Sequence, residues 1–172
     1  TEDEAQKYVI GCRKLIRNDQ PIVGTYGVNK SGSGDMYYKG GNMLHTMRHV
    51  LADDAKWLQM LRGLNREFWH KTVGTAEVEA YISRACGFEF GKVFDQYLRT
   101  TKLPVVCWRS VDGYTEAWFE EVVAGFRVPV VLQVDGKPVR VELHEQPTRL
   151  EGVGAAEKVE LDRNFYMKLQ AR

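Results

Sequence analysis

Two histidines stand four residues apart in the segment HTMRH, at His45 and His49. On a helix this spacing places both rings on one face, as the zinc-peptidase motif HExxH requires. That motif also needs a glutamate at its second position as general base, but Thr46 stands there and the sequence shows no third ligand. We therefore interpret the pair as hydrogen-bonded or solvent-facing histidines, with a self-sufficient metal site as the open alternative.

A second partial match to the same motif occurs in the segment HEQPT, which begins at His144 and Glu145. Thr148 stands where the second histidine belongs, and Pro147 would interrupt the helix that must present the two ligands. We do not expect a metal site here.

The glycine-rich segment GVNKSGSGD resembles the end of a phosphate-binding loop at Lys30 and Ser31. Asn29 precedes the lysine where such a loop requires glycine, and no apolar strand leads into the segment. We therefore do not interpret this loop as a nucleotide site.

Two adjacent tyrosines, Tyr37 and Tyr38, follow the glycine-rich loop at a predicted helix start. A phenol is a neutral donor at pH 7, and one held at the mouth of a loop can be aimed at a developing oxyanion. A half-buried tyrosine that anchors the helix is the alternative.

The element that positions these tyrosines has the apolar spacing of a helix with one buried face, at Met36, Met43, Leu44, Met47, Val50 and Leu51. Gly40 and Gly41 each cost roughly 1 kcal/mol relative to alanine inside a helix. We therefore expect another group to approach the backbone closely at these glycines.

The remaining pattern predicts an α+β fold, with helices followed by a small antiparallel β-sandwich. A first helix carries Tyr8 to Ile16, Asp35 caps the second, a third follows Asp53, Thr75 caps a fourth that stops at Gly87, and a fifth carries Phe90 to Leu98. After Leu103-Pro104 the pattern predicts strands at 105–108, 114–119, 128–134, 139–143, 158–161 and 165–169. The predicted domains are 1–102 and 103–172.

Tryptophan and cysteine are expected in the core. Trp57, Trp69, Trp108 and Trp118 lie on predicted apolar faces or strands, so packing is favoured over sugar stacking. Cys12, Cys86 and Cys107 match no metal-binding spacing and are interpreted as small buried hydrophobes.

Composition excludes several classes of partner. Lys and Arg total 24 against 23 Asp and Glu without a long block of either sign, so we expect no nucleic-acid partner. No apolar run approaches a membrane span. The chain begins at Thr1 without an initiating methionine, so we expect it to be part of a longer protein.

Two segments resemble the membrane alanyl aminopeptidase-like zinc metallopeptidases, which include leukotriene-hydrolase-type gluzincins. Tyr37-Tyr38-Lys39-Gly40 is similar to the YxKG motif of that family, and an apolar helix follows it. FDQYLRTTKLP, residues 94–104, resembles the end of its helical part before a β-sandwich. The resemblance covers roughly residues 5–110 and suggests the C-terminal part of a thermolysin-like catalytic domain.

This resemblance implies that Tyr37 donates a hydrogen bond to the oxyanion formed during peptide cleavage, and that Gly40 and Gly41 let the helix approach the site. Zinc would be bound in a parent protein by an HExxH helix and a downstream glutamate, which are absent from these residues. The chain alone should then be inactive and bind no zinc. A peptide substrate and the rest of the catalytic domain are the implied partners, and a periplasmic or cell-envelope location is implied.

The alternative is a non-catalytic module that binds protein or glycan through a helical bundle and a β-sandwich. An upstream sequence without HExxH would favour that alternative. Under the peptidase interpretation, apolar surface once covered by the parent would be exposed, so self-association is also expected.

Overall fold

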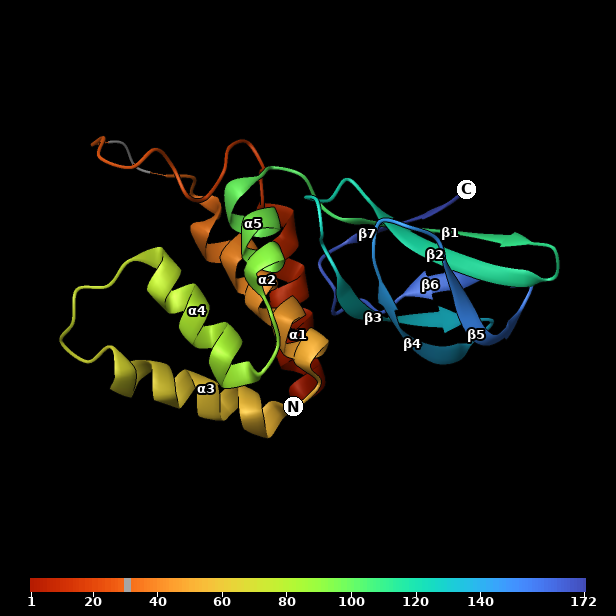
Figure 1. Ribbon diagram of the computed structural model, residues 1–172, viewed down its shortest axis with the longest axis horizontal. Coiled ribbons are helices and arrows are strands. Elements are labelled where there is room, and N and C mark those ends of the chain that lie inside the picture. Colours follow the sequence, from red (N-terminus) through yellow and green to blue (C-terminus); the bar gives the residue numbers. More distant parts are fainter. Residues whose placement is uncertain (30–31) are drawn as a thin grey trace.

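The computed structural model describes residues 1–29 and 32–172 and has an α+β fold. The helices gather at one end of the molecule and the strands at the other, with the chain crossing once between them after α5 (Figure 1). The predicted fold class is therefore confirmed, whereas the division into two domains at residue 103 stays a prediction.

The helices follow the predicted order, with small differences at their ends. They are α1 (Glu2–Gly11), the 3-10 turn η1 (Cys12–Leu15), α2 (Asp35–Leu51), α3 (Asp54–Glu67), α4 (Thr75–Cys86) and α5 (Gly91–Arg99). Gly74, and not Thr75, is the N-cap of α4, where the Glu77 carboxylate accepts its backbone N–H at 2.8 Å. Gly87 ends α4 in the left-handed conformation as predicted.

The seven strands of the described residues form two sheets. β5 (Thr148–Gly154), β2 (Tyr114–Glu120), β1 (Val105–Val111) and β7 (Lys168–Ala171) pair in that order. The second sheet has the order β4 (Lys137–Leu143), β3 (Val128–Val134) and β6 (Val159–Leu161). All pairs are antiparallel except β1 with β7.

Two strand predictions were wrong. β5 was not predicted, because Gly152 and Gly154 interrupt its alternation and only Leu150 is fully buried. The strand predicted at 165–169 begins instead at Lys168, since Phe165 and Tyr166 turn inward and are buried before the chain pairs with β1.

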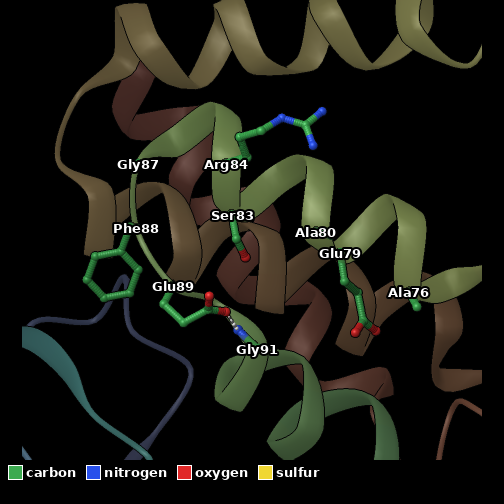
Figure 2. Close-up of a pocket in the computed structure, with 9 residues that line it drawn as sticks. All are labelled: Ala76, Glu79, Ala80, Ser83, Arg84, Gly87, Phe88, Glu89 and Gly91. Carbon is green, nitrogen blue, oxygen red and sulfur yellow. Dashed lines mark hydrogen bonds between the residues drawn. The ribbon is translucent and has the colours of Figure 1, made fainter.

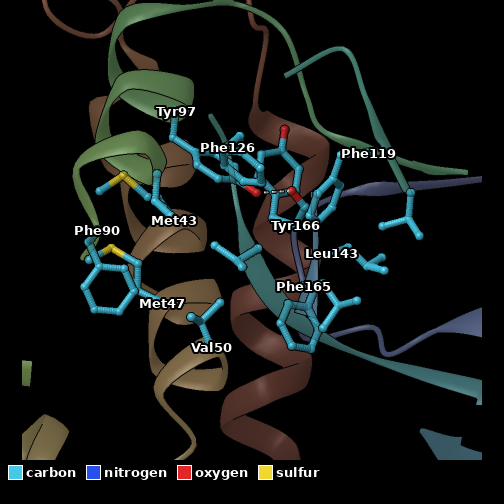
Figure 3. Close-up of a cluster of buried hydrophobic side chains, with 14 of the residues drawn as sticks. Met43, Met47, Val50, Phe90, Tyr97, Phe119, Phe126, Leu143, Phe165 and Tyr166 are labelled. Atoms are coloured by element: carbon cyan, nitrogen blue, oxygen red, sulfur yellow. Dashed lines mark hydrogen bonds between the residues drawn. The ribbon is translucent and has the colours of Figure 1, made fainter. Parts of the chain in front are cut away.

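One hydrophobic cluster runs through the helical and β parts. Figure 3 shows Met43, Met47 and Val50 of α2 on one side of it, and Phe165 and Tyr166 from the turn between β6 and β7 on the other. The two sheets also bury side chains in this cluster, among them Phe119, Val130, Leu132 and Leu143. α2 is therefore packed against both α5 and β3.

The predicted apolar faces are only partly buried. On α2, Met43, Met47 and Val50 are buried, but Met36 and Leu44 are exposed. On α3, Trp57 and Met60 are buried, whereas Leu58, Leu61 and the following Trp69 are exposed. The prediction of a core position was wrong for Trp69, because α3 ends at Glu67 and Trp69 falls outside its periodic face.

Candidate functional site

The first turn of α2 is fixed to the preceding chain by the buried carboxylate of Asp35. One oxygen accepts the backbone N–H of Arg17 at 3.0 Å, and the other accepts that of Asn18 at 2.7 Å. Asp35 is not the cap that the sequence predicted, because Gly34 occupies the N-cap position and the Ser33 hydroxyl accepts the Asp35 N–H at 3.1 Å. The loop from Arg17 to Asp35 is therefore closed at its base.

A buried lysine fixes the next turn of α2 to α5. Lys39 is completely buried, and its Nζ donates a hydrogen bond of 2.8 Å to the backbone carbonyl of Thr100. Burial lowers the pKa of the Lys39 ammonium, and the nearby Asp35 carboxylate partly offsets that effect. Two buried charged side chains thus hold the helix start that carries Tyr37.

Tyr37 lies between these anchors but points away from the core. Its side chain is 74% exposed and that of Tyr38 is 39% exposed. The alternative in which the first tyrosine is a half-buried anchor therefore does not fit Tyr37. A phenol on a fixed helix turn and open to solvent can donate a hydrogen bond to a ligand without first being uncovered.

A shallow groove of about 240 Å³ adjoins Tyr37 where α1 meets α2. Its floor is formed by Asn42, whose amide nitrogen donates to the carbonyls of Val9 and Tyr38 while its oxygen accepts from Arg13 at 2.7 Å. No charged side chain of the described residues lines the groove, whose members are Tyr8, Val9, Cys12, Tyr37, Tyr38, Gly41 and Asn42. The groove suits an uncharged group.

Within the described residues, the two glycines of this helix do not serve the close approach that the sequence suggested. A Cβ added at Gly40 or at Gly41 would meet no heavy atom within 4 Å among the described residues. No described residue makes that approach, since Gly41 opens onto the groove and Gly40 also has free space, so an approach by a group from the rest of the parent protein stays a prediction.

The histidine pair lies at the other end of α2, away from Tyr37. The ring centroids of His45 and His49 are 4.6 Å apart, and His45 Nε2 lies 3.0 Å from Asn164 Oδ1. Burial lowers the pKa of both imidazoles. The interpretation of His45 as a hydrogen-bonded histidine is confirmed, whereas the Nε2 atom of His49 is buried without a partner among the described residues.

The structure does not bring the remaining candidate residues from the sequence together into one site. His144 lies in the turn between β4 and β5, where its Nδ1 accepts the backbone N–H of Gln146 at 3.0 Å. Lys30 and Ser31 lie outside the described residues. Cys86 and Cys107 are buried as predicted, but Cys12 is only half-buried and lines the groove beside Tyr37.

The described residues do not supply a zinc site. Within residues 1–29 and 32–172, no three side chains from His, Cys, Asp and Glu come together in a way that could hold a metal ion. The pair His45 and His49 has Asn164 as its polar neighbour and lacks a third ligand of those types. A zinc-dependent reaction would need ligands from residues other than these.

A second hollow, of about 540 Å³, lies between α4 and the start of α5 (Figure 2). Small side chains of α4 form one wall, and the Glu89 carboxylate at the other wall accepts the Gly91 N–H at 2.8 Å. Glu79, which also lines it, is paired with Arg99. No histidine or cysteine lines this hollow among the described residues. We therefore consider it a weaker candidate for a chemical site than the groove at Tyr37.

None of the helices in the described ranges has both the length and the apolar character needed to cross a lipid bilayer.

The chain matches no protein-family model and no curated protein sequence. Among solved structures, its fold is similar to that of Legionella pneumophila aminopeptidase A in complex with aspartic acid, with a TM-score of 0.47 and 10% sequence identity. The similarity covers 79% of this chain but only 16% of that chain. Likeness at this level assigns neither an activity nor a residue role.

Proposed function

We propose that these residues are the C-terminal part of a zinc-dependent aminopeptidase, in which Tyr37 stabilises the oxyanion formed during peptide-bond hydrolysis. The proposal rests on the resemblance of Tyr37-Tyr38-Lys39-Gly40 to the YxKG motif. The structural observation that supports it best is the exposure of the Tyr37 phenol on a helix turn that Asp35 and Lys39 hold from inside.

The chemistry assigned to this chain is hydrogen-bond donation. When a peptide carbonyl is attacked, its oxygen gains negative charge, and a fixed donor stabilises this charge more than it stabilises the neutral carbonyl. Because the helix turn is already held in place, little reorganisation is needed when the charge develops. The neutral groove beside Tyr37 would accept an uncharged part of the peptide.

Under this proposal the zinc ligands come from other residues of the longer protein. The residues described here contain no group of three His, Cys, Asp or Glu side chains that could hold a metal ion. We therefore expect hydrolysis only from a longer protein that contains these residues together with an HExxH helix.

The test is Tyr37→Phe in that longer protein, with Tyr38→Phe as the matched control. Loss of the Tyr37 hydroxyl should lower kcat about 100- to 1000-fold with little change in KM, as for the loss of other oxyanion donors. Tyr38→Phe removes an equivalent hydroxyl one residue away and should change kcat far less. Equal effects of the two substitutions, or an unchanged kcat in Tyr37→Phe, would remove Tyr37 from the mechanism.

A further inference from the structure

Besides the chain crossing after α5, the β part contacts the helices through a short turn between β6 and β7, residues 162–167, which we call the junction segment. The backbone N–H of Tyr166 donates to Thr46 Oγ1 of α2 at 2.9 Å, and its carbonyl accepts the Tyr97 hydroxyl of α5 at 2.7 Å. Phe165 and Tyr166 are both buried at this contact (Figure 3). The junction segment therefore attaches the β part to α2 and α5 through these bonds, and Arg163 of the same segment also pairs with Asp3 of α1 at 2.5 Å.

Two histidines of α2 sit within this attachment. His45 Nε2 is 3.0 Å from Asn164 Oδ1, and the ring of His49 lies 6.3 Å from that of Phe165. The rings of His45 and His49 are 4.6 Å apart, so a proton on each would place two like charges in contact. His49 Nε2 is buried without a partner among the described residues, so a proton on it would add a buried N–H with no acceptor there.

The charged groups around the pair act in both directions, because the arginines lower the pKa of the imidazoles and the carboxylates raise it. Among the described residues they include groups from η1, α2, α3, β4 and the junction segment, namely Arg13, Arg48, Arg140, Asp54 and Asp162. Glu2 of α1 lies 3.3 Å from Arg48. Asp54 is itself bound by Arg48 through two hydrogen bonds of 2.6 Å. Arg48 therefore offsets much of the electrostatic effect that the Asp54 carboxylate would otherwise have on the two imidazoles.

We propose that His45 and His49 form an acid-sensitive latch, which takes up protons in mildly acidic solution and releases the junction segment from α2 while the sheets and helices stay folded. In the released state the two rings are no longer held in contact, and both imidazoles are accessible to water. Because α2 also carries Tyr37, acid would loosen the β part from the helix that presents this tyrosine. The latch does not depend on the proposed peptidase activity.

The direction of the pH effect follows from burial. Burial is the main cause that lowers the pKa of both histidines below the ordinary value of 6.5, and at His45 it outweighs the hydrogen bond with Asn164, which raises the pKa. The released state therefore binds more protons than the attached state once the pH falls below about 6.5. Attachment is at full strength above that pH and weakens by up to about tenfold per histidine for each pH unit below it, until the pKa of the attached state is reached.

Three other titratable groups near the histidines keep their protonation state between pH 7.5 and 5. Burial raises the pKa of the Tyr97 and Tyr166 hydroxyls, so both stay neutral. The Arg48 guanidinium lowers the pKa of Asp54, which stays ionised. A transition between pH 7.5 and 5 would therefore report on the histidines.

The Tyr166 amide is a direct reporter, because it donates across the junction to Thr46. Its hydrogen exchange, corrected for the intrinsic pH dependence, is measured in the whole chain from pH 7.5 to 5, with amides of the β3–β4 ladder as the reference. We expect its protection to fall about tenfold or more by pH 5.5 while the reference amides keep theirs.

The chain has four histidines, which provides a matched control. His45→Gln with His49→Gln should abolish the pH dependence, whereas His70→Gln with His144→Gln, at two exposed positions, should preserve it. If the first double variant does not fold, ring resonances of the natural chain decide, since the pKa values of His45 and His49 should lie below the ordinary value of 6.5. Constant Tyr166 protection down to pH 5, or a transition that persists without His45 and His49, would overturn the latch.

Discussion

The Asp35 carboxylate accepts the backbone N–H of Asn18 at 2.7 Å, which ties the first turn of α2 to a segment 17 residues earlier in the chain. Its other oxygen accepts the N–H of Arg17 at 3.0 Å. Asp35 is buried, so water cannot readily replace it as acceptor. This one side chain closes the loop before α2 and fixes the backbone two residues ahead of Tyr37.

Asp35→Asn should therefore destabilise the fold. The amide keeps one acceptor oxygen but turns the other position into a donor, which then faces the N–H of Arg17 or Asn18. We expect the free energy of unfolding to fall by about 1–3 kcal/mol, measured by urea denaturation.

The matched control is Asp19→Asn in the same loop. Asp19 is exposed, and its Oδ1 accepts the Ser33 hydroxyl at 3.1 Å, a role that an amide oxygen can keep. This change should stay within about 0.5 kcal/mol of the natural chain. Comparable losses from the two substitutions would show that the Asp35 bonds are not what holds the helix start.

The helices were predictable because their apolar spacing and end signals are local. Asp53 accepts the N–H of Lys56 as the N-cap of α3, and Gly87 ends α4, as the residue types indicate. The strands on either side of Asp135-Gly136 were predicted from the same kind of local signal.

The burial pattern of α2 could not be read from its sequence. Lys39, Asn42 and Thr46 are buried although they are polar, while Met36 and Leu44 are exposed. Each buried polar side chain binds a backbone group from a distant part of the chain, such as the Thr100 carbonyl for Lys39 and the Tyr166 N–H for Thr46. A periodicity argument weighs hydrophobicity alone and has no information on these partners.

The candidate site was predictable in part. The sequence places Tyr37 at a helix start, which is where the structure has it. The groove beside it depends on the packing of α1 on α2, and the Asn164 neighbour of His45 is 119 residues away. Such contacts depend on the tertiary fold, and a single sequence contains no local signal for them.

Alanine at Gly40 or at Gly41 should stabilise the protein. Both glycines lie inside α2, and an added Cβ meets no heavy atom within 4 Å among the described residues. Each substitution removes the flexibility of glycine from the unfolded chain, so the free energy of unfolding should rise by roughly 0.5–1 kcal/mol. Thermal and urea denaturation measure this change.

The same two substitutions should differ in their effect on the reactivity of Cys12, which lines the groove. Gly41 lines it and Gly40 does not, so only Gly41→Ala adds a methyl group to the groove that Cys12 also lines. Cys12 should then react more slowly with a bulky thiol reagent in Gly41→Ala than in Gly40→Ala, while the buried Cys86 and Cys107 react slowly in both. Destabilisation by either alanine would mean that a group does approach the helix there, as the sequence first suggested.

Gln96 of α5 joins the helical part to the β part through all its polar atoms. Its side chain is completely buried, with Nε2 donating to the carbonyls of Lys102 at 3.0 Å and Glu121 at 3.1 Å. Its Oε1 accepts the backbone N–H of Val123 at 2.7 Å. Three backbone groups, one just before β1 and two between β2 and β3, therefore depend on one side chain.

Gln96→Leu keeps a similar volume but leaves these three groups without their partner. Because an unsatisfied buried polar group costs about 1–3 kcal/mol, we expect a loss of about 3 kcal/mol or more in the free energy of unfolding. Gln59→Leu makes the same chemical change at an exposed position of α3 and should have an effect within about 0.5 kcal/mol. A small loss at Gln96, measured by urea denaturation beside that control, would mean that water reaches the three backbone groups and that the contact of α5 with the β part is less tightly packed than these hydrogen bonds indicate.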